Sequence, residues 1–210
     1  MKNPDNIHTG IPRVKSIYPP EKVLGTYGST PNERKAIIDV CHKLYDETKE
    51  EITYIEIGIW LGATFKEILE ETKDIKLKGI GVDLFEDFKI INDITKPSLG
   101  NTHHGDVAKK EDVEKKLNSL GITNFKLLKG DTVEVINSFP VMKNVVCFID
   151  ANHTYEGVKN DFNAMFPKIK NGYVIFDDMD WTTIKRFFDE IKSQYPIEYK
   201  DSRCAIIKIN

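Results

Sequence analysis

One stretch decides the fold of this chain: Thr53-Tyr54-Ile55-Glu56-Ile57-Gly58-Ile59-Trp60-Leu61-Gly62-Ala63-Thr64. Its first half is apolar and rich in β-branched residues, which predicts a buried parallel strand. Two glycines follow, and glycine allows tight turns and close approaches that a Cβ atom would block. The residues from Leu61 to Thr72 then place apolar side chains at helical spacing. The stretch therefore predicts a strand, a glycine turn and a helix.

This strand–turn–helix unit is typical of a site for a nucleotide-type ligand. The first N–H groups of the helix would point back at the turn and favour an anionic group. Glu56 is expected at the carboxyl edge of the strand, facing the crevice. The spacing is Glu-x-Gly-x-x-x-Gly, which differs from the G-x-G-x-x-G of dinucleotide-binding folds. On this stretch alone, a tight turn in any α/β domain explains the pattern equally well.

Composition restricts the class of protein. The chain has 210 residues, of which 30% are charged and 40% hydrophobic, as expected for a soluble domain with a full core. A net charge of -3 argues against nucleic acid as an obligate partner. The odd number and wide spacing of Cys41, Cys147 and Cys204 predict reduced core residues rather than a disulfide or zinc framework. With no leader-like or membrane-spanning apolar run, the expected location is cytoplasmic, without a membrane partner.

Two regions are expected along the chain. Residues 1–30 are expected to form an N-terminal arm or lid, because prolines and glycines interrupt them while apolar residues recur. The arm would pack over a ligand or against a second subunit in a homodimer. Residues 31–210 are expected to form a single domain. Its first helix starts with Thr30 as N-cap, Pro31 in the first turn and Glu33 completing a capping box.

Acidic residues follow two further predicted strands. The strand at residues 77–84 ends near Asp83, about 20 residues beyond the glycine turn, where an acid accepts hydrogen bonds from ribose hydroxyls. Residues 125–132 are expected to form a strand and its turn, and the turn contains Asp131 and Thr132, near the expected position of an adenine. Helix capping by Asp131 or Thr132 is an alternative that the sequence leaves open.

Three more acids end the next two predicted strands. Asp150 ends the strand at residues 144–150, whereas Asp177 and Asp178 end the strand at residues 172–178. Carboxylates that meet at one sheet edge repel each other and raise at least one pKa. A hard divalent cation such as Mg²⁺ relieves this repulsion. The alternative is that Asp177 or Asp178 caps a turn or pairs with Lys or Arg.

The remaining segments predict a loop and a hairpin. A long polar insertion at residues 85–106 contains His103 and His104, which are expected to be exposed loop residues rather than metal ligands. The strands at residues 196–199 and 204–209 are too close for a crossover helix, so they must pair antiparallel. The whole is an α/β pattern of five βα units followed by a hairpin.

Two motifs suggest a family. They are Ile149-Asp150-Ala151-Asn152-His153-Thr154-Tyr155-Glu156-Gly157-Val158, followed by Asp161, and Asn171-Gly172-Tyr173-Val174-Ile175-Phe176-Asp177-Asp178. With the Glu56 stretch, they resemble the class I S-adenosylmethionine (SAM) methyltransferases over roughly residues 50 to 180. More narrowly, they resemble small-molecule O-methyltransferases, including the macrocin-type sugar O-methyltransferases and cephalosporin hydroxylase-like proteins. Asn171 and Ala151 depart from glycines that are common in that family.

The resemblance implies a fold, two cofactors and a reaction. The fold would be three-layer and Rossmann-like, with a mostly parallel seven-stranded sheet whose last strand is antiparallel. Mg²⁺ or another divalent cation would bind Asp150, Asp177 and Asp178. SAM would contact Glu56, Gly58, Gly62, Thr64, Asp83, Leu84, Asp131, Thr132 and Asp150.

The implied reaction is methyl transfer to a hydroxyl of a small molecule, such as a sugar or another polyhydroxylated metabolite. His153 is expected to act as the general base, because the pKa of histidine lies near neutral pH. Its alternative role is to orient a ligand Asp or to cap a helix. Asp161 and Tyr155 are expected to be structural. An NAD-dependent oxidoreductase and a non-catalytic nucleotide-binding protein are the competing interpretations of the same fold.

Overall fold

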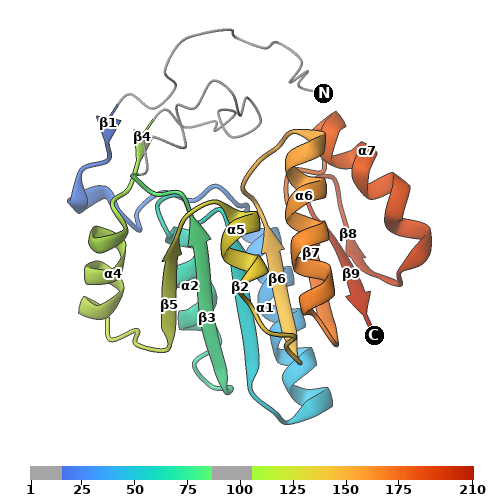
Figure 1. The fold of residues 1–210 in the computed structure, drawn as a ribbon. Helices are drawn as coiled ribbons and strands as arrows, with labels where there is room; N and C mark the ends of the chain where they lie inside the picture. The colour runs from blue at the N-terminus through green and yellow to red at the C-terminus, as the bar shows by residue number, and fades with distance from the viewer. Residues whose placement is uncertain (1–15, 87–105) are drawn as a thin grey trace, which may run out of the picture.

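The computed structural model describes residues 16–86 and 106–210, and a seven-stranded sheet forms its centre (Figure 1). The strand order is β5-β3-β2-β6-β7-β9-β8. These strands are β2 (Ile52–Ile57), β3 (Leu77–Asp83), β5 (Phe125–Lys129), β6 (Val145–Ile149), β7 (Gly172–Phe176), β8 (Ile197–Lys200) and β9 (Ala205–Ile209). Strand β9 runs antiparallel to both of its neighbours, β7 and β8, and all other neighbouring strands pair in parallel. The predicted α/β fold with an antiparallel last strand is confirmed.

Helices cover both faces of the sheet, which gives the expected three layers (Figure 1). The α-helices are α1 (Pro31–Thr48), α2 (Ala63–Glu71), α4 (Lys110–Ser119), α5 (Thr132–Asn137), α6 (Tyr155–Met165) and α7 (Thr182–Ile191). Short 3-10 turns lie at η1 (Pro20–Lys22), η2 (Phe166–Lys168) and η3 (Lys192–Gln194). One hydrophobic cluster joins α1, α2 and α4 to the sheet, and a second cluster joins α5, α6 and α7 to the opposite face.

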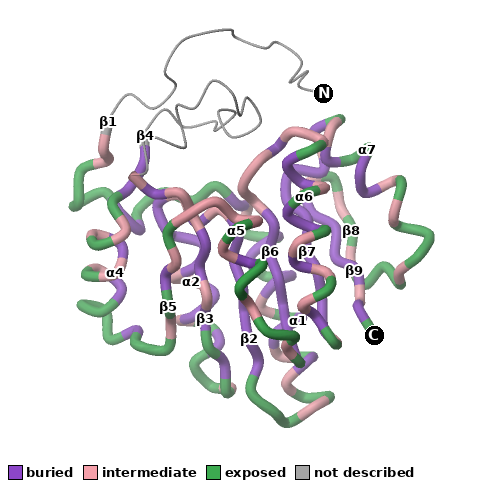
Figure 2. Tube along the Cα trace, in the orientation of Figure 1, coloured by how far each residue is buried: buried purple, intermediate pink, exposed green. Residues whose placement is uncertain are grey.

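Strand β2 lies at the centre of both clusters and is buried along its whole length (Figure 2). Successive side chains of a strand point to opposite faces. Tyr54 accordingly packs in the cluster of α1 and α2, whereas Ile55 and Ile57 pack in the cluster of α5 to α7. This double burial explains why β2 is largely apolar, with Glu56 as its one charged residue.

Local sequence signals account for the helix ends. Thr30 and Glu33 form the predicted capping box at the start of α1, with both reciprocal hydrogen bonds present. Helix α6 ends at Met165. Pro167 lies in the 3-10 turn that follows, and a proline cannot donate the backbone hydrogen bond that continues an α-helix.

The described part of the N-terminal arm packs on the domain. Strand β1 (Ser16–Ile17) pairs in parallel with β4 (Asp106–Val107) in a separate two-stranded sheet. Further along, the Leu24 N–H donates to the Leu61 carbonyl at 3.0 Å. Residues 1–15 of the arm, together with His103 and His104, lie outside the described residues.

Two further expectations concern cysteines and membranes. All three cysteines are buried free thiols, as predicted. Among the described residues, no helix combines the length and the apolar character needed to cross a bilayer.

The carboxyl ends of β2 and β6 meet where the strand order of the sheet reverses. From β2 the chain proceeds to β3 on one side, while β6 pairs with the other side of β2. The Asp150 N–H donates to the Ile57 carbonyl at 2.9 Å, which joins the ends of the two strands. In open α/β sheets, ligands bind in the crevice at such a switch point.

Candidate active site

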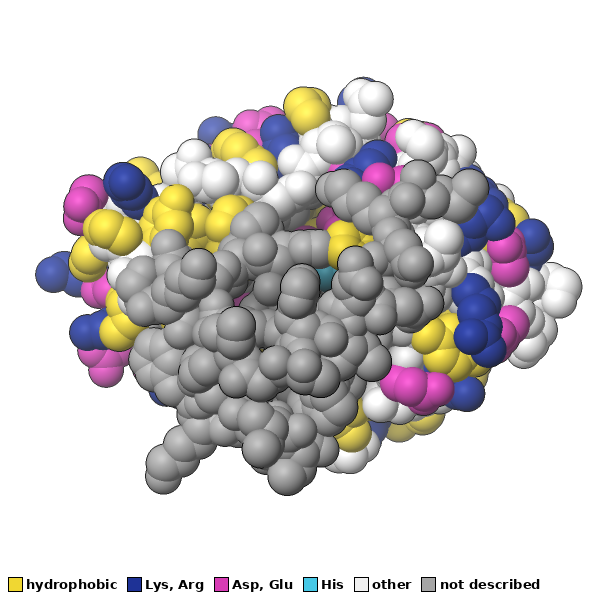
Figure 3. Space-filling model, turned by 90° about the horizontal axis from the view of Figure 1, so that it is seen from above, with side chains coloured by type: hydrophobic (Ala, Val, Ile, Leu, Met, Phe, Trp, Pro, Cys, Tyr) yellow, Lys and Arg dark blue, Asp and Glu magenta, His cyan; other side chains and the backbone are white. Residues whose placement is uncertain are grey.

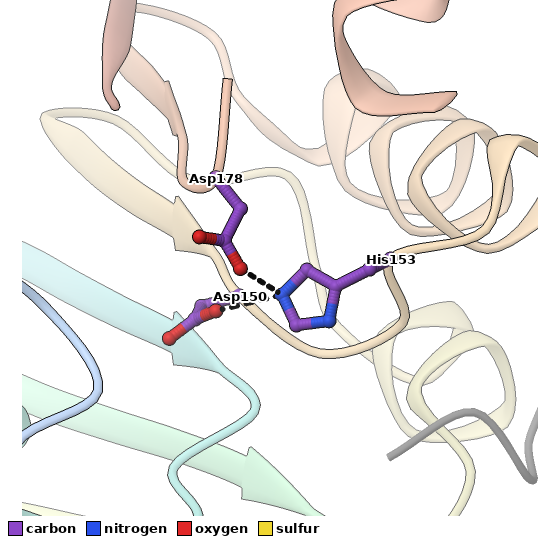
Figure 4. Close-up of side chains that lie close together, drawn as sticks. All are labelled: Asp150, His153 and Asp178. Carbon is purple, nitrogen blue, oxygen red and sulfur yellow. Dashed lines mark hydrogen bonds and ion pairs between the residues drawn. The ribbon is translucent and has the colours of Figure 1, made fainter. Parts of the chain in front are cut away.

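Asp150, His153 and Asp178 form a compact cluster at this edge of the sheet (Figure 4). One ligand atom from each residue lies within 4.8 Å of the others. The Nε2 atom of His153 is 3.3 Å from Asp150 Oδ1 and 3.0 Å from Asp178 Oδ2. Viewed from above, acidic and histidine side chains are visible near the centre of this end of the molecule (Figure 3). The structure thus brings together three residues that the sequence singled out.

One contact holds the ring of His153 and another holds its backbone. The ring of Trp181 stacks on it with centroids 5.3 Å apart, and the Thr183 hydroxyl donates to the His153 carbonyl at 2.5 Å. Burial alone lowers the pKa of His153, but hydrogen bonds with Asp150 and Asp178 outweigh it and raise the pKa to about 9. The imidazole of the protein alone is therefore protonated near pH 7. This differs from the near-neutral pKa on which the prediction of a general base rested.

Asp177 is not part of the compact cluster, although it was predicted as a metal ligand. Its Oδ1 atom accepts a hydrogen bond from the Asp178 N–H at 2.7 Å. Burial, followed by the negative charges of Asp150 and Glu33, raises the pKa of Asp177 well above its usual range. By position, the residues that could hold a cation are Asp150, His153 and Asp178, and Asp177 lies outside this group.

Arg203 and Glu33 complete the surroundings of the cluster. Arg203 lies in the turn between β8 and β9, and its Nη1 atom is 2.5 Å from Asp178 Oδ1 and 3.2 Å from Asp180 Oδ1. Its Nε atom is 3.5 Å from Oε1 of Glu33, a fully buried residue of α1. Sequence reasoning missed Arg203 and interpreted Glu33 only as a helix cap. No local pattern links a lone arginine in a hairpin turn to acids on distant segments.

The two glycines of the turn are required by packing within the protein. Gly58 has φ +89°, and an added Cβ atom would lie 2.3 Å from the Asp150 carbonyl oxygen. Gly62 has φ +79°, and its Cβ atom would lie 2.9 Å from the Leu24 side chain. Sequence reasoning assigned both glycines to a tight turn and to the close approach of a ligand. The positive φ values fit the tight turn, and the contact with a ligand stays a prediction.

Glu56 lies beneath the turn and does not face the crevice as expected. It follows Tyr54 on the same face of β2, where its carboxyl group accepts the Tyr54 hydroxyl at 2.6 Å. It also accepts the Phe65 N–H in the first turn of α2. Burial raises the pKa of Glu56 well above its usual range, although the Tyr54 hydrogen bond opposes this. Glu56 therefore supports the start of α2 from inside the core.

A family model described as a methyltransferase domain matches residues 55–179. The chain belongs to this methyltransferase family. The match confirms the predicted recognition and the predicted enzyme class. A curated relative, the uncharacterized protein R132 of Acanthamoeba polyphaga mimivirus, is 28% identical over 136 residues, which cover 62% of this chain and 52% of that protein. The methyltransferase chain thus aligns with about half the length of the curated relative it matches.

Solved structures share the fold of this methyltransferase. The O-methyltransferase NovP superposes with a TM-score of 0.64 at 16% identity, covering 91% of this chain and 88% of NovP. A Podospora anserina methyltransferase bound to S-adenosylhomocysteine gives 0.60 at 11% identity, covering 91% and 86%. A SAM-dependent methyltransferase of Aquifex aeolicus gives 0.50 at 13% identity, covering 91% and 97%. These likenesses confirm the predicted methyltransferase fold.

Asp83, the last residue of β3, connects the sheet to the glycine turn of the methyltransferase. The Asp83 carboxylate accepts the Trp60 N–H at 2.9 Å and the Phe85 N–H at 2.6 Å. Next to it, Leu84 packs against Val107 of β4. Asp83 thus stands at the predicted edge, and its oxygens hold the loop in place.

Other predicted contacts surround the same edge. The hydroxyl groups of Thr64, in the first turn of α2, and Ser29, in the arm, are 2.7 Å apart. Asp131 caps α5 by accepting the N–H groups of the next helical residues at 3.1 and 3.3 Å, so the capping role left open by the sequence is present. Thr132 is the first residue of α5.

Tyr155 and Asp161 were predicted to be structural, and both lie on α6. The Tyr155 hydroxyl donates to Glu190 at 2.7 Å on the exposed side. Asp161 is buried, and its Oδ2 atom makes no hydrogen bond within the described structure. Burial and then the charge of Asp131 raise the pKa of Asp161 to about 7.

Proposed function

We propose that this chain is a SAM-dependent O-methyltransferase that uses a divalent cation to methylate a hydroxyl group of a small molecule. The acceptor would be a sugar or another polyhydroxylated metabolite. The cluster of Asp150, His153 and Asp178 beside the glycine turn carries the proposal. The name of NovP, an O-methyltransferase with the same fold, supports oxygen as the accepting atom.

The donor would bind across the carboxyl ends of β2, β3 and β5. Gly62, the N-cap of α2, offers no side-chain cap, so N–H groups in the first turn suit the carboxylate of a methionine moiety. Asp83 already accepts two N–H groups, yet a carboxylate offers about four lone-pair sites and can also accept ribose hydroxyls. Bound there, SAM would supply an electrophilic methyl group.

The acidic cluster also fits a divalent cation. Two carboxylates and one imidazole offer oxygen and nitrogen ligands within a few ångströms, in a largely buried position. In the protein alone, the His153 proton lies between the same two carboxylates that would bind the ion. A divalent ion held by Asp150 and Asp178 would supply positive charge that lowers the pKa of an acceptor hydroxyl.

The proposed role of His153 is to accept the proton of the acceptor hydroxyl through Nε2. This role requires the neutral imidazole, whereas the protein alone favours the protonated form. Stacking by Trp181 orients the ring, and the Thr183 hydrogen bond holds the backbone of His153, so Nε2 is directed at the cluster. Serving as a cation ligand is the competing role of this imidazole. The variant His153→Gln separates the two roles. If His153 is a cation ligand, the variant should lose cation affinity. If His153 is the general base, the variant should lose only turnover.

Calorimetric titration with SAM and with NAD, each with and without Mg²⁺, tests the function. We expect SAM binding and no NAD binding, and methyl transfer to at least one compound in a screen of sugar nucleotides and hydroxylated metabolites. Binding of NAD alone would contradict the proposal and favour an oxidoreductase. Tight SAM binding without transfer to any acceptor would favour a non-catalytic binding protein.

The assembly is a separate proposal. The arm suggests a homodimer in which residues 1–30 contact a second subunit, without nucleic acid or membrane as partner. Sedimentation equilibrium of the full chain measures this directly, and a monomer at all concentrations would contradict it.

A further inference from the structure

The two carboxylate oxygens of Asp178 face different partners. Oδ2 points into the cluster, 3.0 Å from His153 Nε2 (Figure 4). Oδ1 points the opposite way and forms an ion pair with Arg203 Nη1 at 2.5 Å. A charge-assisted pair of this length holds the carboxylate in one orientation.

Arg203 is itself fixed by several segments. Its N–H donates to Asp201 Oδ1 at 2.7 Å, and its carbonyl accepts the Met179 N–H at 2.9 Å. The guanidinium group reaches Asp180 and Glu33, so the start of α1 and the loop after β7 both hold it. Because these contacts hold Arg203, movement of its guanidinium group away from Asp178 would also disrupt its ion pairs with Asp180 and Glu33.

The backbone of Asp178 contributes to the same orientation. Its φ is +51°, in the left-handed region that residues other than glycine rarely adopt. Such strain persists only where the surroundings over-determine it. The Asp177 side chain, which accepts the Asp178 N–H, and Arg203 supply those surroundings.

We propose that Arg203 is a positioning residue that makes the site prefer Mg²⁺ over Ca²⁺. The inference rests on the proposed cation-assisted function. Mg²⁺ takes single carboxylate oxygens in strict octahedral geometry, whereas Ca²⁺ accepts carboxylates through one or both oxygens and more ligands in total. By retaining Oδ1, Arg203 leaves Asp178 with Oδ2 as its cation ligand. Asp178 then cannot bind Ca²⁺ through both carboxylate oxygens, which would increase the affinity for Ca²⁺.

Comparing Mg²⁺ with Ca²⁺ separates the effect of the orientation of Asp178 from the effect of the charge of Arg203. Removal of Arg203 takes away a positive charge, which strengthens the binding of any divalent ion. Mg²⁺ and Ca²⁺ carry equal charge, so this effect largely cancels in the ratio of their affinities. A change in the ratio therefore reports the freedom of Asp178 Oδ1.

The experiment is calorimetric titration of Mg²⁺ and Ca²⁺ into the full chain, without donor or acceptor. For Arg203→Gln, we expect the affinity of Ca²⁺ relative to Mg²⁺ to rise at least about tenfold. Arg186→Gln is the matched control, because Arg186 forms an exposed ion pair with Glu190 on α7. It should leave the ratio unchanged. An unchanged ratio in Arg203→Gln would overturn the inference.

A second variant keeps the test valid if Arg203→Gln fails to fold. Loss of Arg203 leaves buried acids without their cation, and breaking such a pair is strongly destabilising. The double variant Glu33→Gln with Arg203→Gln removes one charge of each sign, and Gln can keep the capping box of α1. It should show the same rise in ratio. A wild-type chain that binds neither ion would overturn the cation site itself, whereas wild-type binding with unchanged ratios would overturn only the role of Arg203.

Discussion

The Nε2 atom of His153 lies 3.0 Å from Oδ2 of Asp178, although the two residues follow different strands. The imidazole comes from the loop before α6 and the carboxylate from the loop after β7. Together with Asp150, they share one small space that either a proton or a cation fills. This competition links the protonation of the site to its proposed chemistry.

Asp178→Asn should abolish cation dependence while leaving the donor site intact. The amide keeps the size of the side chain but removes a charged ligand, so we expect Mg²⁺ affinity to fall and turnover to drop at least about 100-fold. SAM affinity, measured by calorimetry, should stay within a factor of about two. Asp189→Asn on α7 is the control, since that acid pairs with two exposed lysines. Unchanged turnover in Asp178→Asn would remove the cation from the mechanism.

Mg²⁺ binding should release a proton near pH 7. The pKa of His153 is raised to about 9 in the protein alone, so the imidazole is protonated at that pH, and a cation on the same carboxylates displaces the proton. Affinity should therefore increase as pH rises towards 9. The measurement is calorimetry at pH 7 in buffers of different ionisation enthalpy. An observed heat that does not depend on the buffer would contradict the competition.

Asp161→Asn should stabilise the protein above pH 7. The folded-state pKa is raised to about 7 from an ordinary value of 3.8, so the unfolded state loses its proton first as pH rises. The free energy of unfolding of the wild type therefore falls as the pH rises from 4 to 7. The Asn side chain of the variant does not ionise, so the variant should be more stable than the wild type above pH 7, by about 1 to 4 kcal/mol. Urea unfolding at pH 4 and pH 8 measures the difference.

The contrast between the two pH values is the internal control for Asp161. At pH 4 the variant and the wild type should differ little, because pH 4 is close to the unfolded-state pKa of 3.8 and most of the loss of stability develops above it. Equal stability of the two proteins at pH 8 would show that the Asp161 carboxyl is solvated or paired in solution.

Gly58→Ala should disturb both the glycine turn of the proposed donor site and the position of Asp150 in the cation cluster. The added Cβ atom would lie 2.3 Å from the Asp150 carbonyl oxygen, so the end of β6 must move, at a cost of at least about 2 kcal/mol. Gly121→Ala is the matched control. Gly121 also has a positive φ, but nothing lies within 4 Å of its added Cβ atom, so only about 1 kcal/mol of backbone strain is expected. Equal losses of stability in thermal unfolding would contradict this role of Gly58.

Much of the site was predictable because strand ends can be recognised locally. An apolar run followed by an acid locates Asp150 and Asp178, and parallel strands bring their carboxyl ends to one edge. The spacing of His153 after Asp150 suggested its involvement. The presence of His153 rather than Asp177 in the cluster was not predictable, because it depends on the left-handed backbone of Asp178 and on where the tertiary structure places each side chain.

The sequence by itself determined the fold class, the antiparallel hairpin and the edge of the sheet where polar residues gather. Periodicity and turn chemistry act between near neighbours, so they can be read along the chain. Only the tertiary structure decided that Arg203 orients Asp178, that Gly58 makes room for the end of β6, and that Glu56 is turned inward. These relationships join segments far apart in sequence, and the packing of the whole sheet sets their distances.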